Sequence, residues 1–155
     1  MSYSLIVYTQ NSRFPEPNRL AEEISARSPG LEWSPSCDLR VVRGFVPLGS
    51  TGFEVTRSAI TAAQIESHRE ALREYGEADD VHLAVLLEMD MRTTFRCKDE
   101  DEIAAASVVA GALAKLSDGY VCDPQYDVLV RGDYLPSPTV YRRRQTVDER
   151  ATSKT

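Results

Sequence analysis

The amino-acid sequence predicts an α+β fold, in which a mostly antiparallel sheet carries two or three helices packed on one of its faces. The 155 residues are about one domain's worth of chain, and 42% of them are hydrophobic, which is enough for a single core. Short β-rich segments alternate with segments of helical period, without a repeated parallel crossover. That order is typical of split β-α-β, ferredoxin-like arrangements.

The N-terminal part of the chain predicts one helix and several strands. Residues 3–9 are rich in β-formers and predict the first strand. Asn18 is placed to cap a helix over 18–27. Residues 31–33 predict a short strand. The segments 38–46 and 53–57 predict the two strands of a hairpin.

The middle of the chain predicts a helix between strands. Thr61 is placed to cap a helix over 61–75, which Gly76 ends. The nearly continuous apolar run 81–87 predicts the strongest strand, in a central position. Residues 92–97 predict the strand that follows.

The C-terminal part holds the clearest helix. Asp99 and Glu102 form a capping-box-like start, and the acidic residues of the first turn suit the helix dipole. Asp118–Gly119 then predicts a turn, residues 120–122 a strand, and residues 126–130 a last strand or extended segment.

We expect one domain over residues 1–135. Beyond Pro136 the chain has little to bury, so residues 136–155 are predicted to form an extended or mobile basic tail. This tail contains Arg142–Arg144, which could touch nucleic acid or lipid headgroups. A solvated tail is the simpler interpretation.

Negative charge is concentrated in one part of the chain. Of the net charge of −6, residues 1–75 contribute −1, residues 76–135 contribute −8 and residues 136–155 contribute +3. An acidic surface repels phosphate backbones, so we expect no nucleic-acid partner. It would speed encounter with a basic protein, or serve solubility alone.

Several classes of protein are not expected. No apolar run approaches the roughly 20 residues that a membrane-spanning helix needs. The first residues lack the basic and apolar regions of a secretory signal. Cys37, Cys97 and Cys122 are odd in number and far apart, which predicts neither a disulfide framework nor a metal clip. We therefore expect a cytoplasmic protein.

The candidate catalytic residues are isolated from one another. His68 borders the apolar face of its predicted helix, and a half-buried ring explains it more simply than catalysis. His82 lies in a predicted strand, out of phase with its apolar neighbours. Cys97 and Cys122 are expected to be buried and inert, while the reactivity of Cys37 stays open. No spacing predicts a metal site or a cofactor.

The segment Gly49–Gly52 is rich in small residues, but its spacing matches no phosphate-binding motif. A hairpin loop explains it more simply, and such a loop can carry recognition. The carboxylates near residues 79–80 and 88–90 flank a predicted strand. They could bind a metal or act as acid and base, although solubilised strand ends explain them more simply.

The stretch Asp99–Gln125 joins an acidic helix start, an Ala-rich helix, an Asp-Gly turn and a β-run ending in Asp123-Pro124-Gln125. It resembles a passage found in small cytoplasmic bacterial immunity proteins, which neutralise toxins delivered between competing cells. The resemblance covers about a sixth of the chain. It implies an inhibitor that blocks a toxin's active site without catalysis of its own.

We therefore expect a non-catalytic protein-binding inhibitor of a basic toxin, acting through an acidic surface with loop or aromatic anchors. The expected contact residues are Glu77, Asp79, Asp80, Glu88, Asp90, Ser50, Thr51, Tyr126 and Tyr134.

Other functions stay open. Antiparallel sheets with helices on one side often pair to enclose ligands, so a small-molecule sensor using the Gly49–Gly52 loop is one alternative, and a homodimer is possible. A small enzyme using His82 with Glu88 or Asp90 is another. A structural or assembly role is the last.

Overall fold

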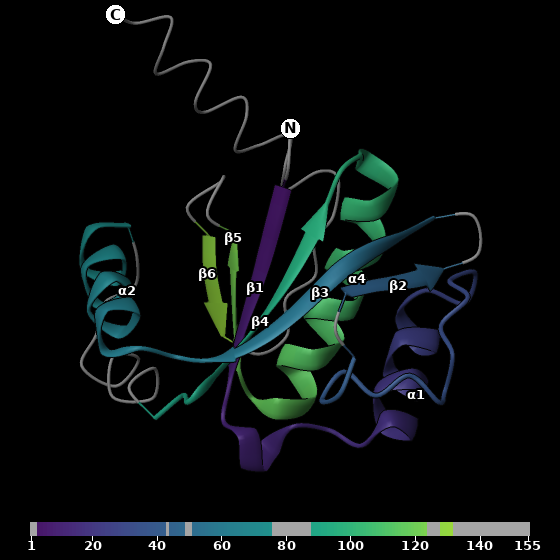
Figure 1. Ribbon diagram of the computed structural model, residues 1–155, viewed down its shortest axis with the longest axis horizontal. Coiled ribbons are helices and arrows are strands. Elements are labelled where there is room, and N and C mark those ends of the chain that lie inside the picture. The colour runs from purple at the N-terminus through teal and green to yellow at the C-terminus, as the bar shows by residue number, and fades with distance from the viewer. Residues whose placement is uncertain (1–2, 43, 49–50, 76–87, 124–127, 132–155) are drawn as a thin grey trace, which may run out of the picture.

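The protein is described by a computed structural model over residues 3–42, 44–48, 51–75, 88–123 and 128–131. Within these residues the chain forms strands and helices in the mixed order that the sequence predicts (Figure 1). The elements are β1 (Tyr3–Thr9), the 3-10 helix η1 (Asn11–Arg13), α1 (Pro17–Arg27), β2 (Gly44–Leu48), β3 (Thr51–Ala59), α2 (Ala62–Tyr75), β4 (Met91–Cys97), α4 (Glu100–Ser117), β5 (Tyr120–Asp123) and β6 (Val128–Arg131).

The described strands form one sheet in the order β2-β3-β4-β1-β5-β6, and every neighbouring pair is antiparallel. Strands β1 and β4 occupy the middle of this order, with Leu5 paired to Phe95. The predicted α+β class with an antiparallel sheet is therefore confirmed. The finer, ferredoxin-like assignment stays a prediction.

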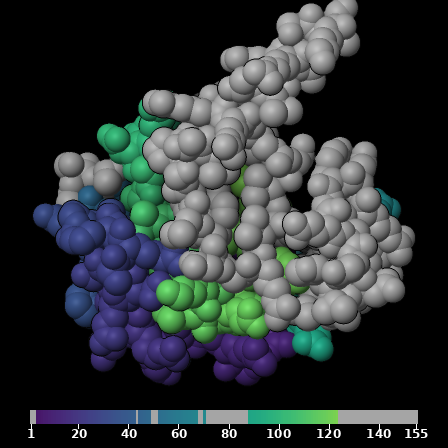
Figure 2. All heavy atoms as spheres, turned by 180° about the vertical axis from the view of Figure 1, so that it is seen from behind, coloured from purple at the N-terminus to yellow at the C-terminus, as the bar shows by residue number. Residues whose placement is uncertain are grey.

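Helices α1 and α4 cover one face of the sheet. Helix α4 contacts β1, β3, β4 and β5 and packs against α1, and it runs behind the strands in Figure 1. Figure 2 shows this helical face from behind, with α1 in purple to blue and α4 in green. Helix α2 lies toward the β6 side of the sheet, away from α1.

The main core lies between these two helices and the sheet. Because side chains alternate across a strand, every second residue of β1, β3 and β4 points to the helices. Each strand contributes buried side chains to this core, among them Leu5 and Val7, Phe53 and Val55, Phe95 and Cys97. At its edge, the ring of Trp33 stacks on Phe53 with centroids 6.4 Å apart.

Helix α4 begins and ends as the sequence predicts. Asp99 is its N-cap and accepts a hydrogen bond from the backbone N of Glu102 at 2.9 Å, while the Glu102 carboxylate accepts one from the backbone N of Lys98. At the other end Asp118 adopts a left-handed conformation (φ 54°), which Asp tolerates better than most residues. Gly119 follows, and its Cα lies so close to the Tyr8 carbonyl oxygen that a Cβ would collide with it.

Two predictions in the N-terminal part are wrong. Helix α1 begins at Pro17 rather than at a capping Asn18, because the fixed φ of proline suits the first turn of a helix. Residues 31–33 form no strand. The backbone N of Trp33 donates to the carbonyl of Leu31 at 2.9 Å, and this tight local bond excludes an extended conformation.

The predicted hairpin exists, but its boundaries are shifted. Asp38 begins a turn, in which its carbonyl accepts hydrogen bonds from the backbone N of Val41 and Val42, so β2 starts only at Gly44. The predicted connecting loop 47–52 is mostly strand. Pro47 pairs with Gly52, and Leu48 pairs with Thr51.

Other predictions are confirmed or lie outside the described residues. Thr61 and Gln64 cap the start of α2 reciprocally, with 3.2 Å from the Gln64 backbone N to Thr61 Oγ1 and 3.0 Å from the Thr61 backbone N to Gln64 Oε1. The strand at 92–97 corresponds to β4. The predicted strand 81–87 and the tail 136–155 lie outside the described residues.

Candidate interaction surface

The two described acidic residues of the predicted contact set lie where β1 ends and β4 begins. Asp90 is exposed, and its Oδ1 accepts a hydrogen bond from the backbone N of Asn11 at 2.7 Å, while its own backbone N donates to the carbonyl of Thr9 at 3.1 Å. Glu88 is exposed beside it and accepts a hydrogen bond from Gln10 Nε2 at 3.4 Å. Asp90 therefore holds the turn that follows β1.

The predicted loop contact lies at the other end of the sheet. Thr51 is the first residue of β3, and the last residue of that strand, Ala59, pairs with Met91 next to Asp90. Eight residue steps of about 3.3 Å separate the two ends, roughly 25 Å in all. The structure therefore does not bring Thr51 together with Glu88 and Asp90.

The remaining predicted contacts fall outside the described residues, as does His82, while His68 lies on α2. The contacts concerned are Glu77, Asp79, Asp80, Ser50, Tyr126 and Tyr134.

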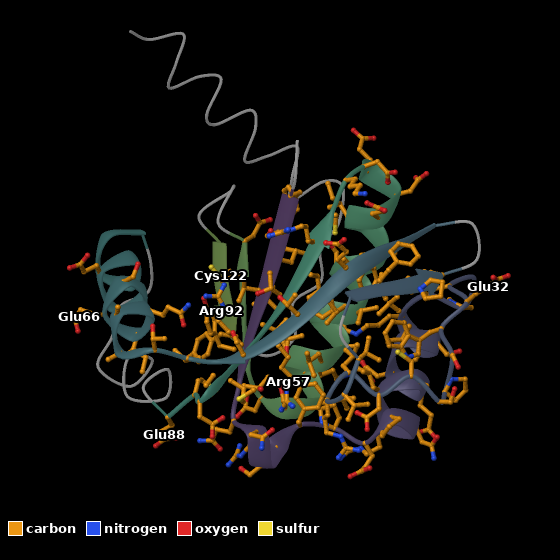
Figure 3. All side chains as sticks on the ribbon, viewed as in Figure 1. Glu32, Arg57, Glu66, Glu88, Arg92 and Cys122 are labelled. Atoms are coloured by element: carbon orange, nitrogen blue, oxygen red, sulfur yellow. The ribbon has the colours of Figure 1, made fainter. Side chains whose placement is uncertain are left out.

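The acidic segment does not form a single surface within the part of the chain that the structure describes. Glu88 and Asp90 precede β4, and Figure 3 places Glu88 beyond that end of the strands. The acidic cluster 99–102 follows β4, at its opposite end. Asp99 and Glu102 are already engaged there in capping α4.

The cysteines are unfavourably placed for nucleophilic chemistry. Cys97 is fully buried, as predicted, and burial, with the nearby Glu102 and Asp99 carboxylates, raises its pKa to about 12. Cys37 is half-buried, and burial followed by the charge of Asp38 raises its pKa as well. A raised pKa keeps the thiol protonated and unreactive at neutral pH. Cys122 is half-buried rather than buried.

We call the face of the sheet that points away from α1 and α4 the outer face. Part of it is covered: Tyr8 and Tyr120 are buried there with Met89 in a second, smaller cluster. Burial, together with the neighbouring Cys122 thiol, raises the pKa of Tyr8, and the Arg92 guanidinium partly offsets this. Figure 3 shows Arg92 and Cys122 together in this region. The covered part of the outer face thus lies over β1 and β5.

The rest of the outer face, over β2, β3 and the Arg96 end of β4, is open. On β3 the alternate residues Glu54, Thr56 and Ser58 are all exposed. On β4 the outer positions are Arg92, Thr94 and Arg96, of which Arg96 is exposed and the other two are half-buried. The opposite residues of β4 are buried in the main core, so the strand has one apolar and one basic face.

Phe45 stands out on this open surface. It lies on the edge strand β2 opposite Glu54, and 59% of it is exposed. Its ring lies diagonally across Gly52: a Cβ at that glycine would come within 2.8 Å of Phe45 Cε2 and closer still to Cζ. Gly52 therefore makes the space that the ring occupies. Val41, in the turn before β2, is the other large hydrophobic residue that is exposed in the described part of the chain.

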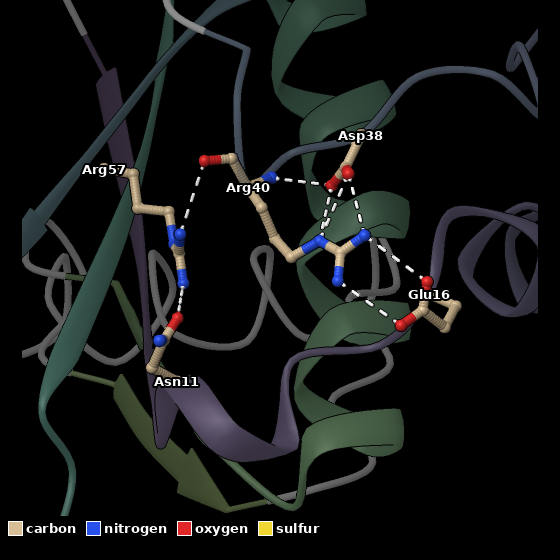
Figure 4. Close-up of polar contacts among 5 residues, drawn as sticks. All are labelled: Asn11, Glu16, Asp38, Arg40 and Arg57. Atoms are coloured by element: carbon tan, nitrogen blue, oxygen red, sulfur yellow. Dashed lines mark hydrogen bonds and ion pairs between the residues drawn. The ribbon is translucent and has the colours of Figure 1, made fainter.

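A polar network braces the turn that leads into β2 (Figure 4). The Arg40 guanidinium bonds both Asp38 oxygens, at 2.8 to 3.1 Å, and forms an ion pair with Glu16 at 3.3 Å. The hydrogen bond from Arg40 is the largest cause of the lowered pKa of Asp38. Arg57, on β3, donates to the Arg40 carbonyl at 3.4 Å and to Asn11 Oδ1, and its guanidinium lies 4.6 Å from the centre of the Phe14 ring.

Arg57 reaches this network from a position that otherwise belongs to the core. It occupies the helix-facing side of β3, in register with the buried Thr93. The network therefore serves to fix the position of the chain before β2, and with it the base from which Phe45 projects.

The contact residues predicted from the sequence do not include the outer side of β4, although the sequence carries a signal for it. From Arg92 to Lys98 basic or hydroxyl side chains alternate with residues that are buried in the structure. A period of two in a predicted strand indicates one buried and one solvated face. Phe45 gave no such signal, because the segment 38–46 was expected to be one continuous strand with Phe45 in its apolar set.

No group of three or more His, Cys, Asp or Glu side chains in the described residues is arranged to hold a metal ion. None of the helices described is long and apolar enough to cross a bilayer. Comparison with known proteins yielded no matching family model, no matching curated sequence and no matching solved structure.

Proposed function

We propose that the protein is a non-catalytic binding protein that inhibits a partner protein, an immunity protein of the kind that the 99–125 resemblance implies, acting in the cytoplasm. The proposed contact surface is the open part of the outer face, with Phe45 as its anchor. It replaces the acidic strand end around Glu88 and Asp90, where Asp90 is already used to hold a turn.

The observation that carries the proposal is the exposure of a large aromatic ring, that of Phe45. Interfaces are enriched in aromatic residues, and a few buried aromatic anchors supply most of the binding energy. The Phe45 ring lies over Gly52, in space that a Cβ at that position would fill. Burying the ring in a pocket of the partner would stabilise a complex.

The surroundings of Phe45 suit an interface as well. Glu54 and Arg96 provide charged groups near the ring, and Thr56 and Ser58 provide small exposed hydroxyl groups on β3. A standard interface buries about 800 Å² on each partner.

The proposal is tested with the product of the neighbouring open reading frame as the candidate toxin. Co-expression is expected to restore growth to cells that make the candidate toxin, and the purified proteins are expected to form a 1:1 complex in which the toxin's activity is lost. Absence of both protection and complex formation would contradict the proposal. So would protection in which this chain chemically alters the toxin, since that would be catalysis.

A further inference from the structure

We infer, resting on the proposed function, that the partner meets the open outer face with an acidic surface around an apolar pocket that receives Phe45. This differs from the basic contact surface that the net charge of the chain suggests. The inference follows from the charges near Phe45. These are mainly basic, whereas the net charge of the whole chain is negative.

The open outer face is basic within an acidic chain. Arg96 is exposed on the outer side of β4, and the exposed Lys98 continues the same alternation just beyond the strand. The half-buried Arg92 belongs to the covered part, beside Tyr8. Glu54 is the acidic residue among the described outer positions of β2, β3 and β4. The chain as a whole carries −6. A partner surface that complements this face therefore supplies carboxylates, because like charges across an interface are costly.

Arg96 is the residue best placed to meet such a carboxylate. It is exposed, it lies opposite Glu54 in the register, and Glu54 is in turn opposite Phe45. In the described part of the structure, neither Glu54 nor Arg96 forms an ion pair or a side-chain hydrogen bond, although they are cross-strand neighbours. The guanidinium is therefore available for bidentate bonding to a carboxylate at the rim of the pocket.

The partner approaches the face of the sheet rather than its edge. Strand β2 is an edge strand, but Pro47 removes one of its backbone donors, and Gly44 begins it with a left-handed φ of 95°. Proline and backbone irregularity are the usual means by which an edge strand avoids pairing with another chain. The ring of Phe45 lies on the outer face, above Gly52, so packing on that face buries it.

A protein fits this surface better than a nucleic acid does. Single-stranded nucleic acids also use exposed aromatic rings beside basic residues on open sheets. Here, however, Glu54 lies between Phe45 and Arg96, where a phosphate backbone would run, and the net charge of −6 repels a polyanion. A protein can place a cation or hydrogen-bond donor opposite Glu54 and carboxylates opposite Arg96 and Lys98.

The first experiment locates the contact in the native host. A photo-crosslinking phenylalanine analogue replaces Phe45 in one variant of the full chain and, as a matched control, the exposed Ala26 of α1 on the helical face in another. We expect an adduct with one protein from position 45 and none from position 26. The crosslinked partner is then identified and purified. The adduct supports the inference when this purified partner also binds the wild-type chain.

The second experiment measures the charges of the contact with that purified protein. Arg96→Glu is expected to weaken binding by about tenfold or more, because it places like charges together. Arg19→Glu, an exposed substitution of the same kind on α1, is the matched control and is expected to leave the dissociation constant unchanged. Phe45→Ala is expected to weaken binding by removing the anchoring ring, whereas a Cβ at Gly52 would also meet the Val46 carbonyl oxygen and disturb the hairpin itself. Circular dichroism and thermal melting confirm that each variant folds.

The outcomes separate this inference from the function on which it rests. A complex that crosslinks at position 26 but not 45, or that Arg96→Glu leaves unchanged or tightens, overturns the inference and leaves a protein-binding function standing. An adduct between two copies of this chain overturns it, as does tight binding of a single-stranded oligonucleotide that Arg96→Glu abolishes. Absence of any adduct and of any complex overturns both.

Discussion

Close approach of neighbouring atoms explains two glycines of this protein more fully than flexibility does. Gly52 makes room for the Phe45 ring on the outer face, and Gly119 makes room for the Tyr8 carbonyl where α4 turns into β5. Neither position needs a left-handed backbone, and both need the absence of a Cβ. A sequence alone shows such glycines only as breaks in a pattern, because the atom that approaches comes from another strand.

Replacing Gly119 by alanine is expected to destabilise the fold by about 1–3 kcal/mol, the usual cost of forcing an extra carbon into a packed site. The added Cβ would collide with the Tyr8 carbonyl oxygen and would lie 3.0 Å from Ser117 Oγ. Gly30→Ala is the matched control, since nothing lies within 4 Å of a Cβ there, and we expect less than about 1 kcal/mol of change. Urea unfolding measures both, and equal effects would contradict the close-approach explanation.

The buried thiol of Cys97 predicts a dependence of stability on pH. Burial raises its pKa from 9.0 to about 12, so the folded state holds the proton more tightly than the unfolded state does. Its contribution to stability is therefore complete below pH 9 and is lost as the pH rises from 9 to 12. We expect the difference in unfolding free energy between the wild type and Cys97→Ala to shrink over that range, measured by urea denaturation. A difference that stays constant would show that Cys97 does not titrate as described.

At the scale of elements, a charged cluster joins α1 to α4. The Glu23 Oε1 atom on α1 forms two ion pairs. One is with Arg27 Nε, one turn further along the same helix, and the other is with Lys115 Nζ on α4, both at 3.1 Å. Burial acts to raise the pKa of Glu23, but the hydrogen bonds from Lys115 and Arg27 outweigh it, and the pKa is lowered. The carboxylate is therefore more stable in the folded than in the unfolded protein.

Glu23→Gln is consequently expected to lower stability near pH 7 by about 0.5–1 kcal/mol, the size usual for partly exposed ion pairs. Because the folded pKa lies below the ordinary 4.5, the contribution of Glu23 is present above pH 4.5 and is lost as the pH falls through the folded pKa. The wild type and the variant should thus converge at low pH. Glu22→Gln, exposed on the same helix, should match the wild type throughout, and a loss equal to that of Glu23→Gln would count against the ion pairs.

The sequence predicted best those elements whose formation is determined by their own residues. The capped helices α2 and α4 and the strands β1 and β4 follow from caps and alternation within their own residues. The turn before β2 could not be predicted in this way, because the apolar residues of that region are also compatible with a strand. A turn prevails there because Arg40 is held by Asp38 and Glu16 and its carbonyl is bonded by Arg57, and two of these partners are distant in sequence.

The candidate surface was harder to predict than the fold, for a related reason. The basic side of β4 is visible as alternation in the sequence, but its juxtaposition with Phe45 depends on the register of three strands. The acidic contacts were predicted from charge along the chain. The two described ones, Glu88 and Asp90, lie together before β4, but Asp90 is used there to hold a turn, and the predicted loop contact Thr51 lies at the other end of β3.

On the scale of the whole molecule, the two faces of the sheet have different tasks in this account. One carries α1 and α4 and the main core, and the other leaves β2, β3 and the Arg96 end of β4 open, with an exposed aromatic ring among charged groups. The first provides stability, and the second provides the contact with another protein. Substitutions on the open face should therefore alter binding more than stability.

Hydrogen–deuterium exchange of the chain, alone and in its 1:1 complex, tests this division most directly. We expect slower exchange in the complex over residues 44–48, 51–59 and 91–98, and unchanged exchange over α1. Protection centred on α1 and α4, or around Asn11, Glu88 and Asp90 with the open strands unchanged, would show that the partner binds elsewhere and that the proposed contact surface is wrong.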